Sequence, residues 1–128
     1  MSAPVVIVVV DDEALLRWAV AESLIAAGYE VRQADTAAQA VQCLDTAKAS
    51  PLVVVLDLKL PDSSDLSLAR KILADRPDAS VIMMTAHGSA QDKAEAEAAG
   101  VFKFIQKPFD LSEMTAVVRE AAAKMGDR

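Results

Sequence analysis

Five short segments along the chain have the length and composition of β-strands. Residues 5–10 and 52–56 are uninterrupted runs of aliphatic side chains, most of them β-branched. A run without polar alternation is typical of a parallel strand whose two faces are both covered by other elements. Three further strands are predicted at Glu30–Ala34, 81–84 and 102–106.

Between these strands, hydrophobic residues recur at every third or fourth position, which places them on one face of a helix. In the first such stretch, over about residues 14–27, Leu16, Val20 and Leu24 share a face. Four further helices are predicted from periodicity and capping residues: from Thr36, through 68–73, over Ala90–Ala99, and from Asp110. Strand and helix therefore alternate five times, with no linker or repeat between them.

This alternation predicts an α/β fold. Successive parallel strands are joined by right-handed crossovers, so the helices come to lie on both faces of one open sheet. We therefore expect a single doubly wound domain over residues 1–128, flavodoxin-like, with five parallel strands and five helices. In such sheets, ligands bind in a crevice beyond the carboxyl ends of the strands.

Polar side chains stand at the carboxyl ends of four of the five predicted strands. Asp11 and Asp12 follow the first strand, Asp57 ends the third, Thr85 follows the fourth and Lys107 follows the fifth. Each has an ordinary alternative, because a strand-end Asp can cap the next helix and a Lys or Thr can belong to a surface turn. Their joint occurrence at one edge of the sheet favours a functional site.

The residue types at this edge suit phosphoryl chemistry. Two carboxylates about 4 Å apart repel each other by about 4 kcal/mol at an effective dielectric of 20, so three that converge require a proton or a cation. Mg²⁺ prefers oxygen ligands and usually retains waters and a substrate phosphate. Lys107 adds a positive charge, and Thr85 adds a hydroxyl donor, for the outer oxygens of a phosphoryl group. The pattern therefore predicts a Mg²⁺ site at which Asp57 takes a phosphoryl group.

Composition narrows the partners and the compartment. The net charge of −6 argues against a surface that binds nucleic acid directly. No apolar run approaches the roughly 20 residues of a membrane-spanning helix, and no secretory signal is evident before the first strand. Cys43 is the only cysteine, so no internal disulfide can form, and we expect a cytoplasmic protein.

Four motifs give the chain a specific resemblance. Residues 9–13 read VVDDE, 56–62 read LDLKLPD, 84–87 read MTAH, and 107–109 read KPF. With these motifs in this order and at this spacing, the chain resembles the receiver domain of two-component response regulators, from Val5 to about Lys124. The stretches LRW at 16–18 and MTAHG at 84–88 resemble most closely the nitrogen-regulation branch of that family.

The resemblance implies that Asp57 is the phosphoacceptor and that a sensor histidine kinase or a phosphotransfer protein is the donor. It also implies a Mg²⁺ site made by the carboxylates of Asp11, Asp12 and Asp57 and the main-chain carbonyl of Lys59. Lys107 would pair with the phosphoryl group. The chain would then be a signalling switch rather than an enzyme, one that promotes its own phosphorylation and dephosphorylation.

The same resemblance implies a moving part. Thr85 would hold the phosphoryl group and shift toward it, and Phe104 would then turn inward. That change alters the surface made by the fourth helix, fifth strand and fifth helix, which would control an output domain or a protein partner. Phosphorylation could also drive the formation of a homodimer. Lys59 and His87, two residues after Asp57 and Thr85, would tune the lifetime of the phosphoryl group.

Three other functions fit the sequence less well. A Mg²⁺-dependent phosphohydrolase with an aspartyl-phosphate intermediate, of the haloacid-dehalogenase type, needs a second Asp two residues after Asp57, where Lys59 stands. A nucleotide-binding fold needs a glycine-rich loop after the first strand, where residues 11–14 read DDEA. An interaction module without phosphorylation would lack Asp57 or Lys107. One departure from the family pattern is Asp65, where many receivers have glycine, so the conformation of that loop is left open.

Overall fold

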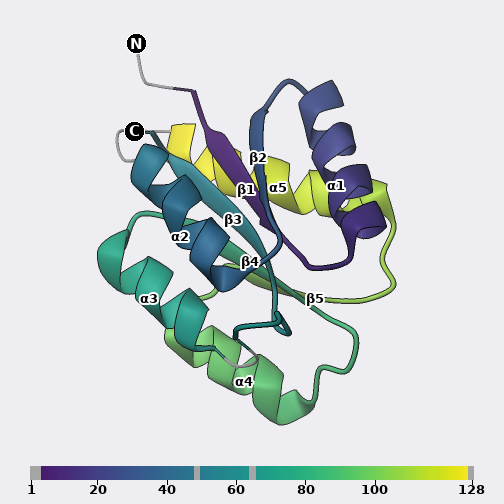
Figure 1. The fold of residues 1–128 in the computed structure, drawn as a ribbon, viewed down its shortest axis with the longest axis vertical. Helices are drawn as coiled ribbons and strands as arrows, with labels where there is room; N and C mark the ends of the chain where they lie inside the picture. The colour runs from purple at the N-terminus through teal and green to yellow at the C-terminus, as the bar shows by residue number, and fades with distance from the viewer. Residues whose placement is uncertain (1–3, 48–49, 64–65, 127–128) are drawn as a thin grey trace.

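A parallel sheet of five strands forms the middle layer of the molecule (Figure 1). The computed structural model describes residues 4–47, 50–63 and 66–126. The strands are β1 (Val6–Val10), β2 (Glu30–Ala34), β3 (Leu52–Asp57), β4 (Ser80–Thr85) and β5 (Lys103–Gln106). They lie in the order β2-β1-β3-β4-β5, and each neighbouring pair is parallel. The order reverses between β1 and β3, which is where a doubly wound sheet opens a crevice at its carboxyl edge.

Five helices cover the two faces of this sheet. They are α1 (Ala14–Ala26), α2 (Ala37–Thr46), α3 (Ser67–Asp75), α4 (Ala90–Ala99) and α5 (Leu111–Gly126). Buried residues of α2, α3 and α4 belong to one core layer, and those of α1 and α5 belong to the other. Figure 1 shows the same division, with α2 and α3 in front of the sheet and α5 behind it.

Alternate residues of the two central strands point into these two layers. Val8 and Val54 pack in the layer of α2 and α3, whereas Val9 and Val55 pack in the layer of α1 and α5. All four are fully buried. Burying one such side chain stabilises the fold by about 1.5–3 kcal/mol. Because both faces of β1 and β3 are covered, their sequences are aliphatic throughout instead of alternating.

The predicted fold class and element order are confirmed, with small differences at the ends of elements. Thr85 was expected to follow the fourth strand, but it is the last residue of β4, because it pairs with Gln106 of β5. Phe102 was expected inside the fifth strand. Its N–H donates to the carbonyl of Val81, but the strand begins one residue later. Asp65, the departure in the loop after Asp57, lies outside the described residues.

Helix α4 begins with a capping box that was not among the predicted caps. The hydroxyl of Ser89 accepts from the N–H of Asp92, and the Asp92 carboxylate accepts from the N–H of Ser89. Ala96 is the one buried residue of this helix, in agreement with the weak apolar periodicity of the sequence. A helix with few buried contacts can move at low cost in free energy.

No helix in the described part of the chain combines the length and the apolar character needed to cross a membrane.

Candidate functional site

The register of the sheet brings the predicted site residues to one edge. β1 and β3 run in register to their ends, so Asp11, directly after β1, lies beside Asp57. On the other side of β3, Thr85 ends β4 and pairs with Gln106. Lys107 follows directly, and its N–H donates to the carbonyl of Thr85 at 2.7 Å. The four strand ends that carry polar residues in the sequence therefore meet in space.

The three aspartates form a tight cluster. One carboxylate oxygen of each of Asp11, Asp12 and Asp57 lies within 4.8 Å of the others. Among the described residues, no other three acidic, His or Cys side chains come this close together. Asp11 is fully buried and Asp57 is 7% exposed, whereas Asp12 is exposed. The cluster is thus closed on the side of the sheet and open to solvent at Asp12.

Lys107 supplies the positive charge of this cluster. Its Nζ donates to Asp11 Oδ2 at 2.9 Å, to Glu13 Oε1 at 3.1 Å and to Asp57 Oδ2 at 3.3 Å. Burial disfavours the ammonium, but the hydrogen bonds to Asp11 and Glu13 and the charges of Asp11 and Asp57 together outweigh burial and raise the pKa of Lys107 above its ordinary value. The side chain therefore stays protonated at neutral pH. Glu13, the last residue of the VVDDE motif, is a partner of Lys107 that was not among the predicted site residues.

Asp57 lies in surroundings that disfavour the ionised form of its carboxyl group. Burial raises the pKa of the Asp57 carboxyl, and the neighbouring Asp11 carboxylate raises it further. The N–H of Lys59, which donates to Asp57 Oδ1 at 3.2 Å, and the ammonium of Lys107 offset part of this effect. A further positive charge at this position would therefore stabilise the ionised carboxylates.

A second basic residue fixes the turn that carries Asp11. Arg17, on α1, donates from Nη1 to the main-chain oxygen of Asp11 at 2.9 Å and from Nε to Gln33 Oε1 at 3.1 Å. The N–H of Glu13 donates to Asp11 Oδ1 at 2.8 Å. The sequence alone does not predict this role of Arg17, because only the packing of α1 against β1 and β2 brings these groups together.

The residues of the predicted switch lie beside the cluster. Thr85 is buried, and its Oγ1 accepts a hydrogen bond from the N–H of His87 at 3.2 Å. Phe104, on β5, is half-buried and packs against the core layer that contains Met83. The side chains of His87 and Lys59 are exposed. The Thr85 hydroxyl thus accepts from its own loop, one step along the sheet from Asp57.

A cavity of about 450 Å³ opens next to Lys107, and its lining includes Leu16, Ala86, Pro108 and Phe109. The Lys107–Pro108 peptide bond at its wall is cis. A largely apolar cavity therefore adjoins Lys107 and Glu13, beside the cluster.

Comparison with known proteins assigns the chain to a family. The family model of the response regulator receiver domain matches residues 7–119. The chain belongs to this receiver family. The matched range contains all the residues of the cluster described above.

Individual relatives agree with this assignment. The transcriptional regulator NtrC of Escherichia coli is 33% identical over 113 residues, which are 88% of this chain and 24% of NtrC. The chain thus spans about a quarter of the length of that relative. A CheY-like receiver domain from Methanospirillum hungatei superimposes with a TM-score of 0.86 at 25% identity, covering 98% of both chains. The beryllofluoride-activated NtrC4 receiver domain, solved as a dimer, has a TM-score of 0.85 at 28% identity, covering 93% of this chain and 97% of that one.

As a receiver domain, the chain is a phosphorylation-activated switch of two-component signalling, and its role is signalling. The resemblance to the nitrogen-regulation branch is confirmed by NtrC. The phosphohydrolase alternative is not favoured.

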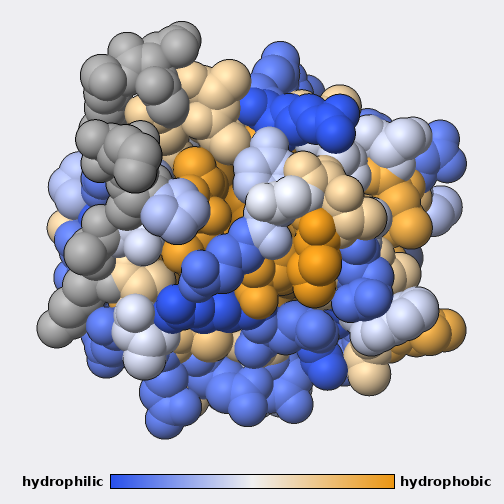
Figure 2. All heavy atoms as spheres, turned by 90° about the horizontal axis from the view of Figure 1, so that it is seen from above, coloured by the Kyte–Doolittle hydropathy of each residue, from blue (hydrophilic) through white to orange (hydrophobic). Residues whose placement is uncertain are grey.

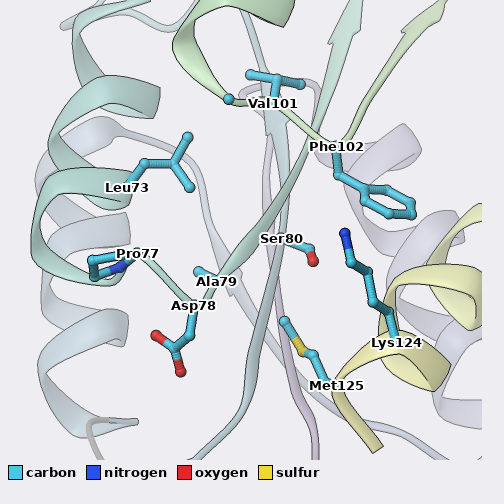
Figure 3. Close-up of a pocket in the computed structure, with 10 residues that line it drawn as sticks. Leu73, Pro77, Asp78, Ala79, Ser80, Val101, Phe102, Lys124 and Met125 are labelled. Carbon is cyan, nitrogen blue, oxygen red and sulfur yellow. The ribbon is translucent and has the colours of Figure 1, made fainter. Parts of the chain in front are cut away.

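The receiver has a second, larger cavity at the opposite edge of the sheet, where the strands begin. It has a volume of about 520 Å³ and lies between the end of α3, the start of β4 and the end of α5. Figure 2 views this end and shows hydrophobic side chains gathered at its centre with polar ones around them. In Figure 3, the ammonium of Lys124 points toward the ring of Phe102, 5.7 Å from the ring centroid. Acidic side chains do not converge here among the described residues.

Proposed function

We propose that Asp57 accepts a phosphoryl group from a sensor histidine kinase or a phosphotransfer protein, and that the modified receiver controls an output domain or a partner protein. One observation carries the proposal: a buried aspartate ends a central strand within reach of two further aspartates and a lysine. Asp62 and Asp78, by contrast, are exposed and lie outside this cluster.

The donor set at the carboxyl edge fits Mg²⁺. Carboxylates are hard oxygen ligands, and the exposed side of the cluster leaves room for the waters that Mg²⁺ retains. Asp11, Asp12 and Asp57 would hold the ion together with the main-chain carbonyl of Lys59, whose N–H already bonds Asp57. When bound, Mg²⁺ would neutralise carboxylate and phosphoryl oxygens.

The residues of the chain divide the chemistry among them. A carboxylate oxygen of Asp57 forms a bond to phosphorus while the phosphorus–nitrogen bond of the phosphohistidine breaks, and the imidazole nitrogen keeps the electron pair. Lys107, fixed by Asp11 and Glu13, offers its ammonium to a phosphoryl oxygen. Thr85 would turn its hydroxyl from the N–H of His87 to the phosphoryl group.

The readout of phosphorylation would follow from Thr85. As Thr85 moves, Phe104 would lose exposure, and the surface of α4, β5 and α5 would change. The small buried contact of α4 supports this, because that helix can adjust at little cost. Lys59 and His87, exposed beside the site, would tune how long the phosphoryl group lasts.

The wider assignments rest on the family. The receiver would promote its own phosphorylation and dephosphorylation as one unit over residues 1–128, in the cytoplasm. A phosphorylation-dependent homodimer is one form of output, and the related NtrC4 receiver domain is a dimer in its activated state.

Treatment with a small acyl phosphate and Mg²⁺ tests this function. Mass spectrometry should show one added phosphoryl group on Asp57, removed by hydroxylamine because the product is an acyl phosphate. Chelation of Mg²⁺ should prevent the reaction. Asp57→Asn should take no label, whereas Asp78→Asn, at the other edge, should be labelled like the wild type. Labelling of Asp57→Asn, or labelling that persists with the chelator, contradicts the proposal.

A further inference from the structure

Gly88 lies in the loop between β4 and α4, three residues after Thr85. The glycines with positive φ among the described residues are Gly28 and Gly100, so the backbone conformation at Gly88 is one that other residues adopt. The reason for a glycine here must therefore be space rather than backbone freedom.

The space at Gly88 is occupied by two residues of the proposed switch. A Cβ atom at this position would lie 2.7 Å from Thr85 Cγ2, 2.7 Å from Phe104 Cε1 and 2.9 Å from Phe104 Cζ. Real Cβ atoms almost never approach other heavy atoms this closely. Neither neighbour is the end of a flexible chain, since Thr85 is buried in the sheet and Phe104 has a rigid ring packed on the core.

We propose that Gly88 is a positioning residue that couples Thr85 to Phe104, because its missing side chain leaves a space that the Thr85 methyl and the Phe104 ring both border. This inference rests on the proposed function only in that phosphorylation of Asp57 moves Thr85. With both groups against the same point of the Gly88 backbone, a shift of Thr85 changes the space open to the ring. A methyl group at residue 88 would force one of them out and break this dependence.

A hydrogen bond in the same loop indicates how a change at Thr85 would reach Phe104. The Thr85 hydroxyl accepts from the N–H of His87, the residue before Gly88. When the hydroxyl turns toward Asp57, that bond is lost, and both the methyl of Thr85 and the loop that carries Gly88 are released. The ring can then settle deeper against Gly88.

A set of unfolding measurements tests the geometry without any phosphorylation. Overpacking a core is destabilising, and Gly88→Ala should lower the folding equilibrium constant by about tenfold or more. Thr85→Ser removes only Cγ2 and keeps the hydroxyl, and Phe104→Leu removes the ring edge. In either background the loss caused by Gly88→Ala should shrink at least about threefold, because contacting residues are energetically coupled. If Gly88→Ala alone does not fold, a folded double variant with Phe104→Leu would also support the proposal, and a double variant that still does not fold would contradict it.

Gly28→Ala is the matched control. Gly28 has φ of 99° and no atom within 4 Å of an added Cβ, so alanine there strains the backbone without touching the switch. Its cost should be equal in all three backgrounds. An equal cost of Gly88→Ala in all three backgrounds would overturn the proposal.

The functional arm uses 4-fluorophenylalanine at position 104 and follows its ¹⁹F resonance when acyl phosphate and Mg²⁺ are added. The resonance should shift in the otherwise wild-type protein and stay fixed in Gly88→Ala, with Asp57 modification measured by mass in the same samples. An equal shift in both proteins contradicts the role of Gly88. Absence of modification in the wild type contradicts the proposed function instead, and leaves the unfolding result to decide on Gly88.

Discussion

The two edges of the sheet carry charged residues in opposite arrangements. At the carboxyl edge, three aspartates converge within 4.8 Å, and Lys107 bonds two of them. At the amino edge, charged side chains disperse: Asp78 lies 3.5 Å from Arg76, and Lys124 lies over an aromatic ring. The larger cavity is at the amino edge. Convergence of like charges, and not the size of a cavity, therefore marks the functional edge of this receiver.

The difference has a physical cause in the strands themselves. β1 is aliphatic to its last residue and β3 to its last but one, and both strands are buried throughout, so the first polar groups, Asp11 and Asp57, lie in a low-dielectric setting. Charges there interact strongly and respond to a cation or a phosphoryl group. Asp78 and Lys124, at the amino edge, are exposed and screened by water, so their charges contribute little to stability or binding.

The largest contrast should come from the two lysines. Lys107→Gln removes the ammonium that the carboxylates hold at the site, and loss of one such fixed group typically costs about 10²-fold or more in rate. Lys124→Gln removes a charge beside the larger cavity and should leave the rate unchanged. The rate of phosphoryl transfer from an acyl phosphate, followed by mass spectrometry, measures both. A comparable loss of rate in Lys107→Gln and Lys124→Gln would show that the carboxyl edge is not specialised for phosphoryl transfer.

The next contrast concerns Mg²⁺. Asp12→Ala removes the exposed oxygen ligand of the cluster and should weaken Mg²⁺ binding by more than the 10–100-fold typical of a lost outer-sphere partner. Asp78→Ala removes an exposed acid at the amino edge and should leave the affinity unchanged. Isothermal titration with MgCl₂ distinguishes them. An unaltered titration of Asp12→Ala would remove Asp12 from the metal site.

A smaller effect should appear in stability. Asp57→Asn removes one of two repelling buried carboxylates and should stabilise the Mg²⁺-free protein by about 1 kcal/mol at neutral pH. Since the folded-state pKa of Asp57 is raised, the folded protein binds more protons than the unfolded chain from about pH 3.9 up to that raised value. Stability of the wild type therefore falls as pH rises through this interval.

Urea unfolding of wild type and Asp57→Asn over this interval gives the measurement. The advantage of the variant should grow with pH and should shrink when Mg²⁺ is added. Asp78→Asn, which removes the exposed acid of the Arg76–Asp78 ion pair, should match the wild type within about 0.5 kcal/mol. A destabilised Asp57→Asn would mean that Lys107 outweighs the repulsion from Asp11.

The fold and the cluster could both be predicted from the sequence, because both depend on where the strands lie and end. Aliphatic runs define β1 and β3, and parallel pairing of these strands then places Asp11 beside Asp57, independently of the loop conformations. Contacts that depend on loop and helix geometry were not predictable. Arg17 reaches Asp11 only because of how α1 packs, and the space at Gly88 depends on the position of one ring of β5.

The smallest expected effect concerns an acid of the carboxyl edge that does not join the cluster. Asp62, five residues after Asp57, accepts from the N–H of Ala37 at 2.7 Å and from that of Ala38 at 3.1 Å, at the start of α2. These two hydrogen bonds lower the pKa of Asp62. Its stabilising effect is therefore fully present above the ordinary carboxyl pKa of about 3.9, and is lost as pH falls through the lower folded-state value.

Asp62→Asn should lower the urea midpoint at neutral pH, because an amide is uncharged and offers one acceptor oxygen instead of two. The difference from the wild type should begin to shrink only below about pH 3.9, and vanish once Asp62 is protonated in the folded protein. Asp57→Asn should behave oppositely, with a difference that changes only above that pH. The pKa values of the two acids thus lie on opposite sides of their common reference value: hydrogen bonds from α2 stabilise the charge of Asp62, whereas burial and the charge of Asp11 disfavour that of Asp57. A difference for Asp62→Asn that is constant from pH 7 to pH 2 would exclude a role for its charge at α2.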